Sequence, residues 1–425
     1  MKAWFIGAVL LAGCITACNL EQITVKDPIK VSSPQPTTQI TKVSLTEAEA
    51  AMVNAGNELT FNMMPLLREG EKSFLFSPLS LQYALGMTAN GASGETLEEI
   101  VKTLGFGTDL DALNGLCHKL LNELPAVDLD VKLQLADAIL VNDKYPLMPS
   151  FKENVESTYY AAVENMSFDN PATVAARIND WAKRNTNGLI DKMLDAGDIS
   201  PADISFLMNA LYFKAPWVSN GRDPRFQKEF THDQKFYPEG CDVIQVPTMH
   251  ASGLYKYANF DDFRVLELPY ASGKFSMYIL LPQGEVGSLM RDFPNLNWKD
   301  IRSKMKTHDV ELALPKFETS SSFRLNDALQ KLGMQRAFTG AAQFDRMFAD
   351  PDLRACIDFV IQKARISVAE WGTEAAAVTV VGMKEASAGP GGEPPVYFIC
   401  DHPFAYLIAE NTSGAILFAG AYCGN

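Results

Sequence analysis

Apolar residues recur at helical spacing in the early part of the chain, which predicts several amphipathic helices. The first helix begins near Thr46, where Thr46 and Glu49 have the spacing of a capping box. Its apolar face is expected to contain Met52, Ala55, Gly56, Leu59, Met63 and Leu66. Ser77-Pro78 and Ser93-Gly94 predict the starts of two further helices, and a fourth is expected over Ala175–Arg184.

Short apolar runs predict strands, and most of these lie in the second half of the chain. The expected strands are Lys132–Val141, Ile204–Phe213, Val265–Pro269, Ser276–Leu281, Val310–Leu314, Arg365–Val368, Phe404–Glu410 and Ala415–Gly420. Because helices gather early, strands dominate late and the two do not alternate regularly, the predicted class is α+β. No interdomain linker is apparent after residue 44, so one large domain is expected.

The N-terminal residues follow neither pattern. The apolar run Ala3–Gly13 is too short to span a bilayer and is typical of a signal peptide. Small residues precede both Cys14 and Cys18, which resembles the lipobox of bacterial lipoproteins, in which the cysteine is acylated. Cys14 has the better consensus, but Cys18 leaves a signal of more ordinary length, so we favour Cys18. A plain secretory signal with incidental cysteines is the alternative.

This assignment divides the chain and places it in the cell. We expect a signal peptide over 1–17, a polar tether containing several prolines over 18–43, and the folded part over 44–425. The mature protein would be anchored in the bacterial cell envelope through an N-terminal lipid, at the outer membrane or the cell surface. No other contact with the membrane is expected.

Composition excludes several classes of function. The chain has 425 residues, with 37 Lys+Arg against 51 Asp+Glu, a formal net charge of −14 and 47% hydrophobic residues. These values are typical of a soluble globular protein and argue against wholesale disorder or a multi-pass membrane protein. An acidic chain lacks the positive field that phosphate contacts require, so no nucleic-acid partner is expected.

Motifs for catalysis and metal binding are absent from the sequence. It contains no G-x-S-x-G, H-E-x-x-H, G-x-x-x-x-G-K-[ST] or G-x-G-x-x-G motif, so an enzyme is a weak hypothesis. The cysteines beyond the signal form no C-x-x-C pair, so no metal is expected. These five are Cys117, Cys241, Cys356, Cys400 and Cys423. We expect most of them to be buried thiols, with a Cys400–Cys423 bridge as an open alternative.

The segment Gly372–Pro395 carries two conflicting patterns. Its composition, GTEAAAVTVVGMKEASAGPGGEPP, is that of a long exposed loop, and such loops are usually functional or disordered. Its first half nevertheless has small or β-branched residues along one strand face, and Glu374 falls on the other face. The residues of that first face are Thr373, Ala375, Ala377, Thr379 and Val381. An insertable strand and a small-residue linker both fit this pattern.

Motifs in a fixed order resemble those of the serpin family from Leu59 to Ala421. They are Phe76-Ser77-Pro78-Leu79-Ser80, Gly91-Ala92-Ser93-Gly94-Glu95-Thr96, Asn209-Ala210-Leu211-Tyr212-Phe213-Lys214 with Trp217, Val265-Leu266-Glu267-Leu268-Pro269-Tyr270, Leu314-Pro315-Lys316-Phe317, Leu332-Gly333-Met334, Glu370-Trp371-Gly372-Thr373-Glu374-Ala375-Ala376-Ala377 and Asp401-His402-Pro403-Phe404. The resemblance implies a single serpin domain, with three β-sheets surrounded by about eight or nine helices. It also implies an exposed reactive-centre loop over 371–395.

The resemblance implies a suicide-substrate inhibitor of serine peptidases, with cysteine peptidases as a second class. In inhibitory members the cut loop, still joined to the peptidase as an acyl-enzyme, inserts as a strand into the main sheet of a metastable fold. Small hinge residues favour this function over a non-inhibitory binding or carrier role, because no proline or charge interrupts insertion before Lys384. No cofactor is implied, and a monomer is expected.

Hinge residues carry over by position. They are Glu370, Gly372, Thr373, Glu374, Ala375, Ala376 and Ala377. Thr373 is expected to be exposed before cleavage. By resemblance, Lys316 is the salt-bridge partner of Glu370, and Trp217 packs where insertion begins.

A polar cluster under the centre of the sheet also carries over. Ser77, Ser80 and Asn209 match residues of the family at the place where strands must part. Gln362 stands where the family has a histidine, so the pH dependence of that histidine is expected to be lost. The Gln362 amide is expected to donate to Asn209 or to a serine hydroxyl.

The bond that a peptidase would cut follows from the spacing of the loop. Counting from Glu370 places it at Ala386–Ser387, which suits elastase-like peptidases with small specificity pockets. Lys384–Glu385 is the alternative for trypsin-like peptidases, and Met383–Lys384 the alternative for chymotrypsin-like or elastase-like ones.

Overall fold

The computed structural model describes residues 36–105, 109–218, 225–350, 352–373 and 394–425. The α-helices of this part of the chain are α1 (Glu47–Leu67), α2 (Pro78–Gly91), α3 (Gly94–Thr103), α4 (Leu110–Glu123), α5 (Pro149–Thr158), α6 (Pro171–Asn185), α7 (Val286–Asp292), α8 (Trp298–Lys304) and α9 (Asn326–Lys331). Short 3₁₀ helices are η1 (Leu124–Ala126), η2 (Ala196–Asp198), η3 (Lys228–Phe230), η4 (Phe293–Asn295) and η5 (Arg336–Phe338).

The predicted helix starts at Thr46, Ser77 and Ser93 are confirmed, whereas α6 begins at Pro171, four residues before the predicted Ala175. Thr46 and Glu49 form the capping box of α1, with Thr46 N–H donating to Glu49 Oε2 and Glu49 N–H donating to Thr46 Oγ1. Ser77 caps α2 through Ser80 N–H, and Pro78 occupies the first helical position, where its missing N–H is not needed. The start of α2 is thereby fixed directly after strand β1 (Phe74–Phe76).

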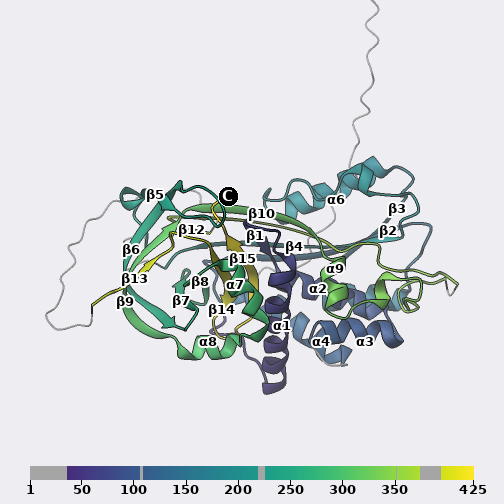
Figure 1. Ribbon diagram of the computed structural model, residues 1–425. Coiled ribbons are helices and arrows are strands. Elements are labelled where there is room, and N and C mark those ends of the chain that lie inside the picture. The colour runs from purple at the N-terminus through teal and green to yellow at the C-terminus, as the bar shows by residue number, and fades with distance from the viewer. Residues whose placement is uncertain (1–35, 106–108, 219–224, 351, 374–393) are drawn as a thin grey trace, which may run out of the picture.

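A six-stranded sheet forms the long face of the molecule (Figure 1). In spatial order its strands are β10 (Phe317–Arg324), β11 (Ile361–Ala369), β12 (Gly372–Thr373), β4 (Ser205–Pro216), β2 (Lys132–Asn142) and β3 (Ala162–Met166). All neighbours are antiparallel except β2 and β3. Helix α6 covers one face of β2 and β4, and α2 packs against the other.

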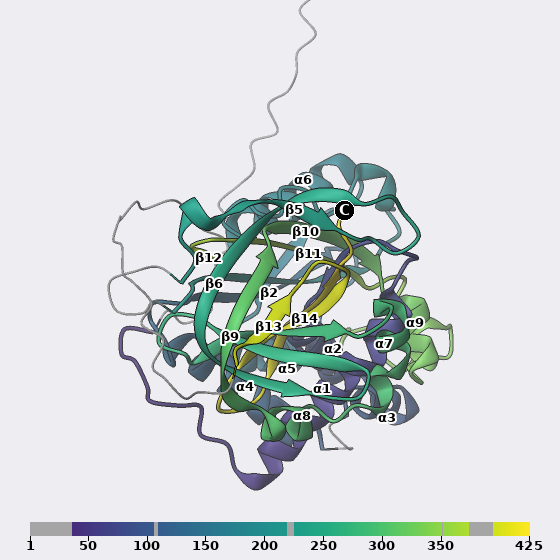
Figure 2. The same ribbon diagram turned by 60° about the vertical axis from the view of Figure 1, so that its left-hand side comes forward.

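The remaining strands form one continuous nine-stranded sheet. Its main path is β1, β15 (Ile416–Tyr422), β14 (Phe404–Glu410), β8 (Phe275–Pro282), β7 (Phe263–Pro269), β6 (Ile244–Asn259), β9 (Lys306–Pro315) and β13 (Val396–Ile399), while β5 (His232–Phe236) pairs with β6. Strands β6, β9 and β13 lie side by side (Figure 2). The resemblance implied two sheets here, but β6 pairs with β5, β7 and β9 and joins them into one.

The prediction that most of the five cysteines are buried thiols is confirmed. Cys117, Cys400 and Cys423 are buried, whereas Cys241 and Cys356 are exposed. All five are free thiols, so the Cys400–Cys423 alternative is wrong. Cys14 and Cys18 lie outside the described residues, as does the predicted signal peptide. Within the described ranges, no helix is long and apolar enough to cross a membrane.

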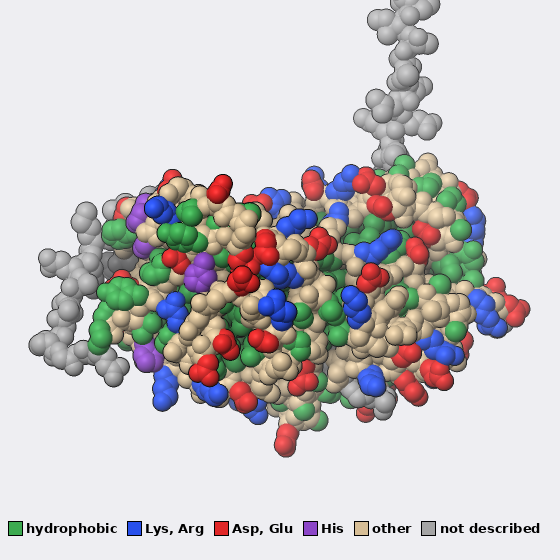
Figure 3. All heavy atoms as spheres, viewed as in Figure 1, with side chains coloured by type: hydrophobic (Ala, Val, Ile, Leu, Met, Phe, Trp, Pro, Cys, Tyr) green, Lys and Arg blue, Asp and Glu red, His purple; other side chains and the backbone are tan. Residues whose placement is uncertain are grey.

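The surface carries charged side chains of both signs (Figure 3). Acidic and basic side chains are interspersed over the face seen in Figure 3, without a continuous basic area on that face. Within the same described part of the chain, no group of three or more His, Cys, Asp or Glu side chains has the arrangement of a metal site.

Candidate functional site

The centre of the six-stranded sheet is incomplete. Among the described residues, strands β11 and β4 are linked through β12 alone, in which Gly372 pairs with Ala369 and Pro216, and Thr373 pairs with Val368 and Ala215. Both long strands continue beyond this short bridge, toward Ile361 and Ser205, with no described strand between them. The sheet therefore has space for a further strand that would extend β12.

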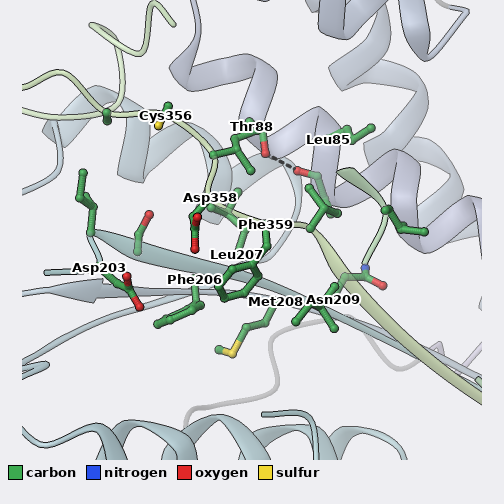
Figure 4. A pocket seen from close by; sticks show the side chains of 18 of the residues that line it. Leu85, Thr88, Asp203, Phe206, Leu207, Met208, Asn209, Cys356, Asp358 and Phe359 are labelled. Carbon is green, nitrogen blue, oxygen red and sulfur yellow. Dashed lines mark hydrogen bonds between the residues drawn. The ribbon is translucent and has the colours of Figure 1, made fainter. Parts of the chain in front are cut away.

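A cavity of about 270 Å³ lies in this space, against α2. Figure 4 shows side chains of α2, of β4 and of the segment that leads into β11 around it. Its lining is largely apolar, with Leu85 and Phe359 as examples, and Asn209 and Gln362 are among its polar members. The opening between the strands is thus bordered by side chains that an inserted apolar strand would cover.

The connection from α6 to β4 closes the outer side of this cavity. Met193 and Leu194 line it, and the side-chain carbonyl of Asn179 on α6 accepts hydrogen bonds from both of their N–H groups. The same connection also contacts β11, because Lys363 Nζ on β11 donates to the carbonyl of Lys192 at 3.0 Å. No sequence pattern indicates these contacts, because they depend on main-chain atoms that any residue supplies.

The end of the opening next to β12 contains the expected ion pair between Lys316 and Glu370. Lys316 Nζ lies 3.1 Å from Glu370 Oε2, and the Glu370 side chain is only 6% exposed. Burial acts to raise the pKa of Glu370, but hydrogen bonds from the backbone and from Lys316 outweigh it and hold this pKa below its ordinary value. The carboxylate is therefore ionised at neutral pH and fixes the end of β11.

Trp217 lies at the same end, as the resemblance implied. Its indole N–H donates to the Ala369 carbonyl at 2.7 Å, and its ring stacks on Tyr270 with the centroids 4.3 Å apart. Its backbone N–H donates to the Trp371 carbonyl. Trp217 thus holds the turn between β11 and β12 from the β4 side.

The expected exposure of Thr373 is wrong. Thr373 is 2% exposed, because β12 already occupies the top of the opening between β11 and β4. Its hydroxyl lies 2.5 Å from the Tyr270 hydroxyl, so its polar atom is paired inside the protein. Strand alternation separates the face of Thr373 from that of Glu374, but it does not indicate how far the sheet extends in the native protein.

The predicted polar cluster divides into two separate groups. In the first, Gln362 accepts from Ser77 N–H and donates to the Ser77 carbonyl, both at 2.8 Å. The Ser77 hydroxyl donates to the Leu417 carbonyl and also caps Ser80 N–H. The expected bond from Gln362 to Asn209 or to a serine hydroxyl is therefore wrong, because the main chain at the start of α2 satisfies the amide.

The second group contains a residue that the sequence analysis missed. Asn209 Nδ2 on β4 donates to Asp137 Oδ1 on β2 at 2.7 Å, and Asp137 is buried. Asp137 lies in the row of Leu133, Leu135 and Ile139, which faces the main core. A single acidic residue in that apolar row is the sequence signal that could have identified it.

The reactive part of the predicted loop lies outside the described residues. This applies to the hinge residues Glu374, Ala375, Ala376 and Ala377 and to the candidate reactive-site residues Met383, Lys384, Ala386 and Ser387. Only the two ends of the segment are described. Thr373 ends in the six-stranded sheet, and Val396 begins β13 at the edge of the nine-stranded sheet.

Comparison with known proteins gives one consistent result. The chain is 34% identical over 375 residues to an uncharacterized serpin-like protein of Thermococcus kodakarensis, covering 88% of this chain and 85% of that protein. It is 36% identical over 360 residues to Serpin-Z2A of Triticum aestivum, covering 81% and 88%.

Solved structures with a similar fold point to the same family. The fold matches the thermophilic serpin tengpin in its native state with a TM-score of 0.80 and 27% identity, over 91% of this chain and 97% of that one. It also matches thyroxine-binding globulin in complex with thyroxine, with a TM-score of 0.77 and 26% identity, over 88% and 99%. The family model described as Serpin (serine protease inhibitor) matches residues 54–424. The chain, with its incomplete central sheet, belongs to the serpin family.

Proposed function

We propose that this protein inhibits serine peptidases as a suicide substrate, by inserting its cleaved loop into the six-stranded sheet. The observation that carries the proposal is the opening between β11 and β4, which begins directly below Thr373. The peptidase serine would attack the carbonyl carbon of the reactive residue, expel the amine of the next residue and remain joined as an ester. Insertion before hydrolysis would then trap the acyl-enzyme.

The pairing of β12 supports a specific register for the inserted strand. Gly372 and Thr373 pair with Ala369 and Val368 on one side and with Pro216 and Ala215 on the other. Continuing this antiparallel register residue by residue would place Thr379 level with both Gln362 and Asn209. The odd-numbered residues that follow Thr373 would face the core, and those up to Val381 are small or β-branched, so the strand would not overfill the space.

The length of the loop also fits this function. Thr373–Ala386 would extend about 46 Å as a strand, at ~3.3 Å per residue. The folded part has a diameter of roughly 55 Å, estimated from the scaling of the radius of gyration with chain length. An attached peptidase would therefore be carried most of the way across the protein and pressed against it. Displacement of catalytic groups by about 1 Å is enough to slow deacylation strongly.

We favour Ala386–Ser387 as the bond that is cut, and elastase-like peptidases as the target class. The alternatives are Lys384–Glu385 with trypsin-like peptidases and Met383–Lys384 with chymotrypsin-like or elastase-like peptidases. The test is the mass of the C-terminal peptide released from the denatured complex. A peptide that begins at Ser387 supports the favoured bond, and one that begins at Glu385 or Lys384 contradicts it.

The inhibitory function itself is tested by incubation with a panel of serine peptidases. A covalent complex that survives boiling in SDS is expected, and the cut protein should unfold at a higher temperature than the intact one, because the added strand completes the sheet. Cleavage without a complex, and equal unfolding temperatures, would contradict the proposal. That outcome would favour a binding role, as in thyroxine-binding globulin, whose fold is similar.

We also propose that the mature protein is attached to the bacterial cell envelope through an acylated Cys18. The support is the lipobox-like sequence before that residue. Mass spectrometry of the mature N-terminus tests this proposal. A diacylglyceryl-modified Cys18 is expected, and modification of Cys14 or an unmodified N-terminus would contradict it.

A further inference from the structure

Asp137 and Asn209 face each other on neighbouring strands at the middle of the six-stranded sheet. They are direct partners in the register of β2 and β4, and one hydrogen bond of 2.7 Å joins Asn209 Nδ2 to Asp137 Oδ1. The other oxygen of each side chain, Asp137 Oδ2 and Asn209 Oδ1, is buried and has no hydrogen-bond partner among the described residues. Both of these atoms are acceptors when the carboxyl is ionised.

The surroundings of Asp137 do not compensate a negative charge. The titratable side chains that act on it from the packed elements are Tyr83 on α2, Cys117 on α4 and Tyr159 after α5. Burial raises the pKa of each of these three groups, so they are neutral at neutral pH. Burial likewise raises the pKa of Asp137 to about 7, although the hydrogen bond from Asn209 opposes this shift.

We propose that Asp137 is a positioning residue that carries a proton in the native protein, and that its Oδ2–H donates to Asn209 Oδ1. The carboxyl and the amide then form a pair with two hydrogen bonds, and both of the unpaired oxygens are satisfied by one proton. This pair joins β2 to β4 and holds Asn209 at the edge of the opening between β4 and β11.

This pair has a consequence for loop insertion, which rests on the function proposed above. The register places Thr379 of the inserted strand beside Asn209 and Gln362. While Asp137 is protonated, Asn209 Oδ1 already accepts one hydrogen bond, so a second one from the Thr379 hydroxyl adds little. When Asp137 loses its proton, this oxygen is free and a buried negative charge remains unpaired beside it. Protonation thus favours the native form, and deprotonation favours insertion.

The direction of the pH effect follows from the raised pKa. The native state binds the proton more tightly than the unfolded chain, so the stabilising contribution of Asp137 is complete below its unfolded pKa, ~4. This contribution is lost as the pH rises through 7. The family's histidine on β11 is replaced by Gln362, which does not titrate. We therefore place the titrating group at the centre of this sheet on β2, at Asp137.

The test compares the wild type with Asp137→Asn, in which the new amide forms the same two hydrogen bonds with Asn209 and does not titrate. The unfolding equilibrium constant of the wild type, from urea denaturation, should increase about tenfold between pH 6 and pH 8. Asp137→Asn should stay at the wild-type pH 6 level at both pH values. Asp309→Asn, at an exposed carboxyl on β9, is the matched control and should follow the wild type.

A second measurement needs no substitution. Infrared difference spectra of the wild type between pH 6 and pH 8 should show loss of a protonated carboxyl band. Absence of this band, or a wild-type pH profile in Asp137→Asn, would overturn the proposal. Insertion after cleavage by a peptidase is measured separately, and should be faster at pH 8 than at pH 6 in the wild type only. If stability titrates as expected but cleavage never raises the unfolding temperature, the inhibitory function fails and the assignment of Asp137 stands.

Discussion

The hydroxyl groups of Thr373 and Tyr270 lie 2.5 Å apart inside the protein, and the Tyr270 ring stacks on Trp217. The first residue of the insertable segment is therefore already held in the sheet before any cleavage. Insertion as proposed would extend an existing short strand, so no new strand would have to nucleate. The native fold would then already contain the paired residues from which the inserted strand grows, so insertion would not require the unfavourable free energy of nucleating a strand.

Thr373→Arg should destabilise the native protein and also prevent inhibition. The position is 2% exposed, so an arginine would either be buried without a partner or force β12 out of the sheet. We expect a loss of up to about 3 kcal/mol in the free energy of unfolding. Thermal unfolding of the intact protein and SDS gels with a peptidase measure the two effects.

Glu374→Arg is the matched control for this substitution, because strand alternation places residue 374 on the opposite face. It should leave both native stability and complex formation close to the wild type. An unchanged unfolding temperature in Thr373→Arg would contradict the buried position of β12.

Gly372→Ala should weaken β12 without adding charge. Gly372 has φ +140°, and a Cβ atom there would lie 2.0 Å from the Ala215 carbonyl oxygen on β4. Neither strand can move away, because Thr373 pairs with Ala215 at the next position. We expect a loss of about 2 kcal/mol in native stability, measured by urea denaturation. Gly273→Ala, at a turn with positive φ but open space around the Cβ position, separates the backbone strain from the clash.

Thr379→Val should affect only the cleaved form. In the proposed register the Thr379 hydroxyl would lie between Asn209 and Gln362, where it would replace contacts with water by a buried hydrogen bond. Loss of the hydroxyl should lower the stability of the cleaved protein by about 1 kcal/mol. Native stability should not change. A loss in the native form, or none in the cleaved form, would show that the register is wrong.

Glu370 should make native stability sensitive to acid. Its pKa is lowered in the folded protein, so its contribution is present above the unfolded pKa and is lost as the pH falls through the folded value. The partner Lys316 is 44% exposed, so solvent screening limits the effect to about 1 kcal/mol or less. The slope of unfolding free energy against pH below pH 5 should decrease in Glu370→Gln. An identical slope in the variant would contradict this assignment.

Much of the fold could be predicted because its signals are local. Hydrophobic periodicity located β2, β4, β14 and β15, and the capping residues Thr46 and Ser77 located two helix starts. Strand β10, with the sequence FETSSSFR, gave no such signal. Its position is set by pairing with β11 along its whole length, a contact between segments far apart in the sequence.

The site was predictable to the extent that side chains alone define it. The pair of Glu370 and Lys316 requires complementary charges, and the resemblance identified both residues. Gln362 differs, since its partners are the N–H and carbonyl groups of Ser77, and the sequence does not show where a main chain will lie. The pairing of Asp137 with Asn209 likewise depends on the register of two strands, which side-chain patterns specify only by face.

The cavity between β4 and β11 also has a mechanical consequence. Insertion as proposed would fill part of its volume of about 270 Å³ with side chains, so the inserted form would be the denser of the two. Hydrostatic pressure favours whichever state has eliminated internal void volume. In most folded proteins that state is the unfolded one. Here compression would also drive the chain toward a more ordered form, with a more complete sheet than the native protein has.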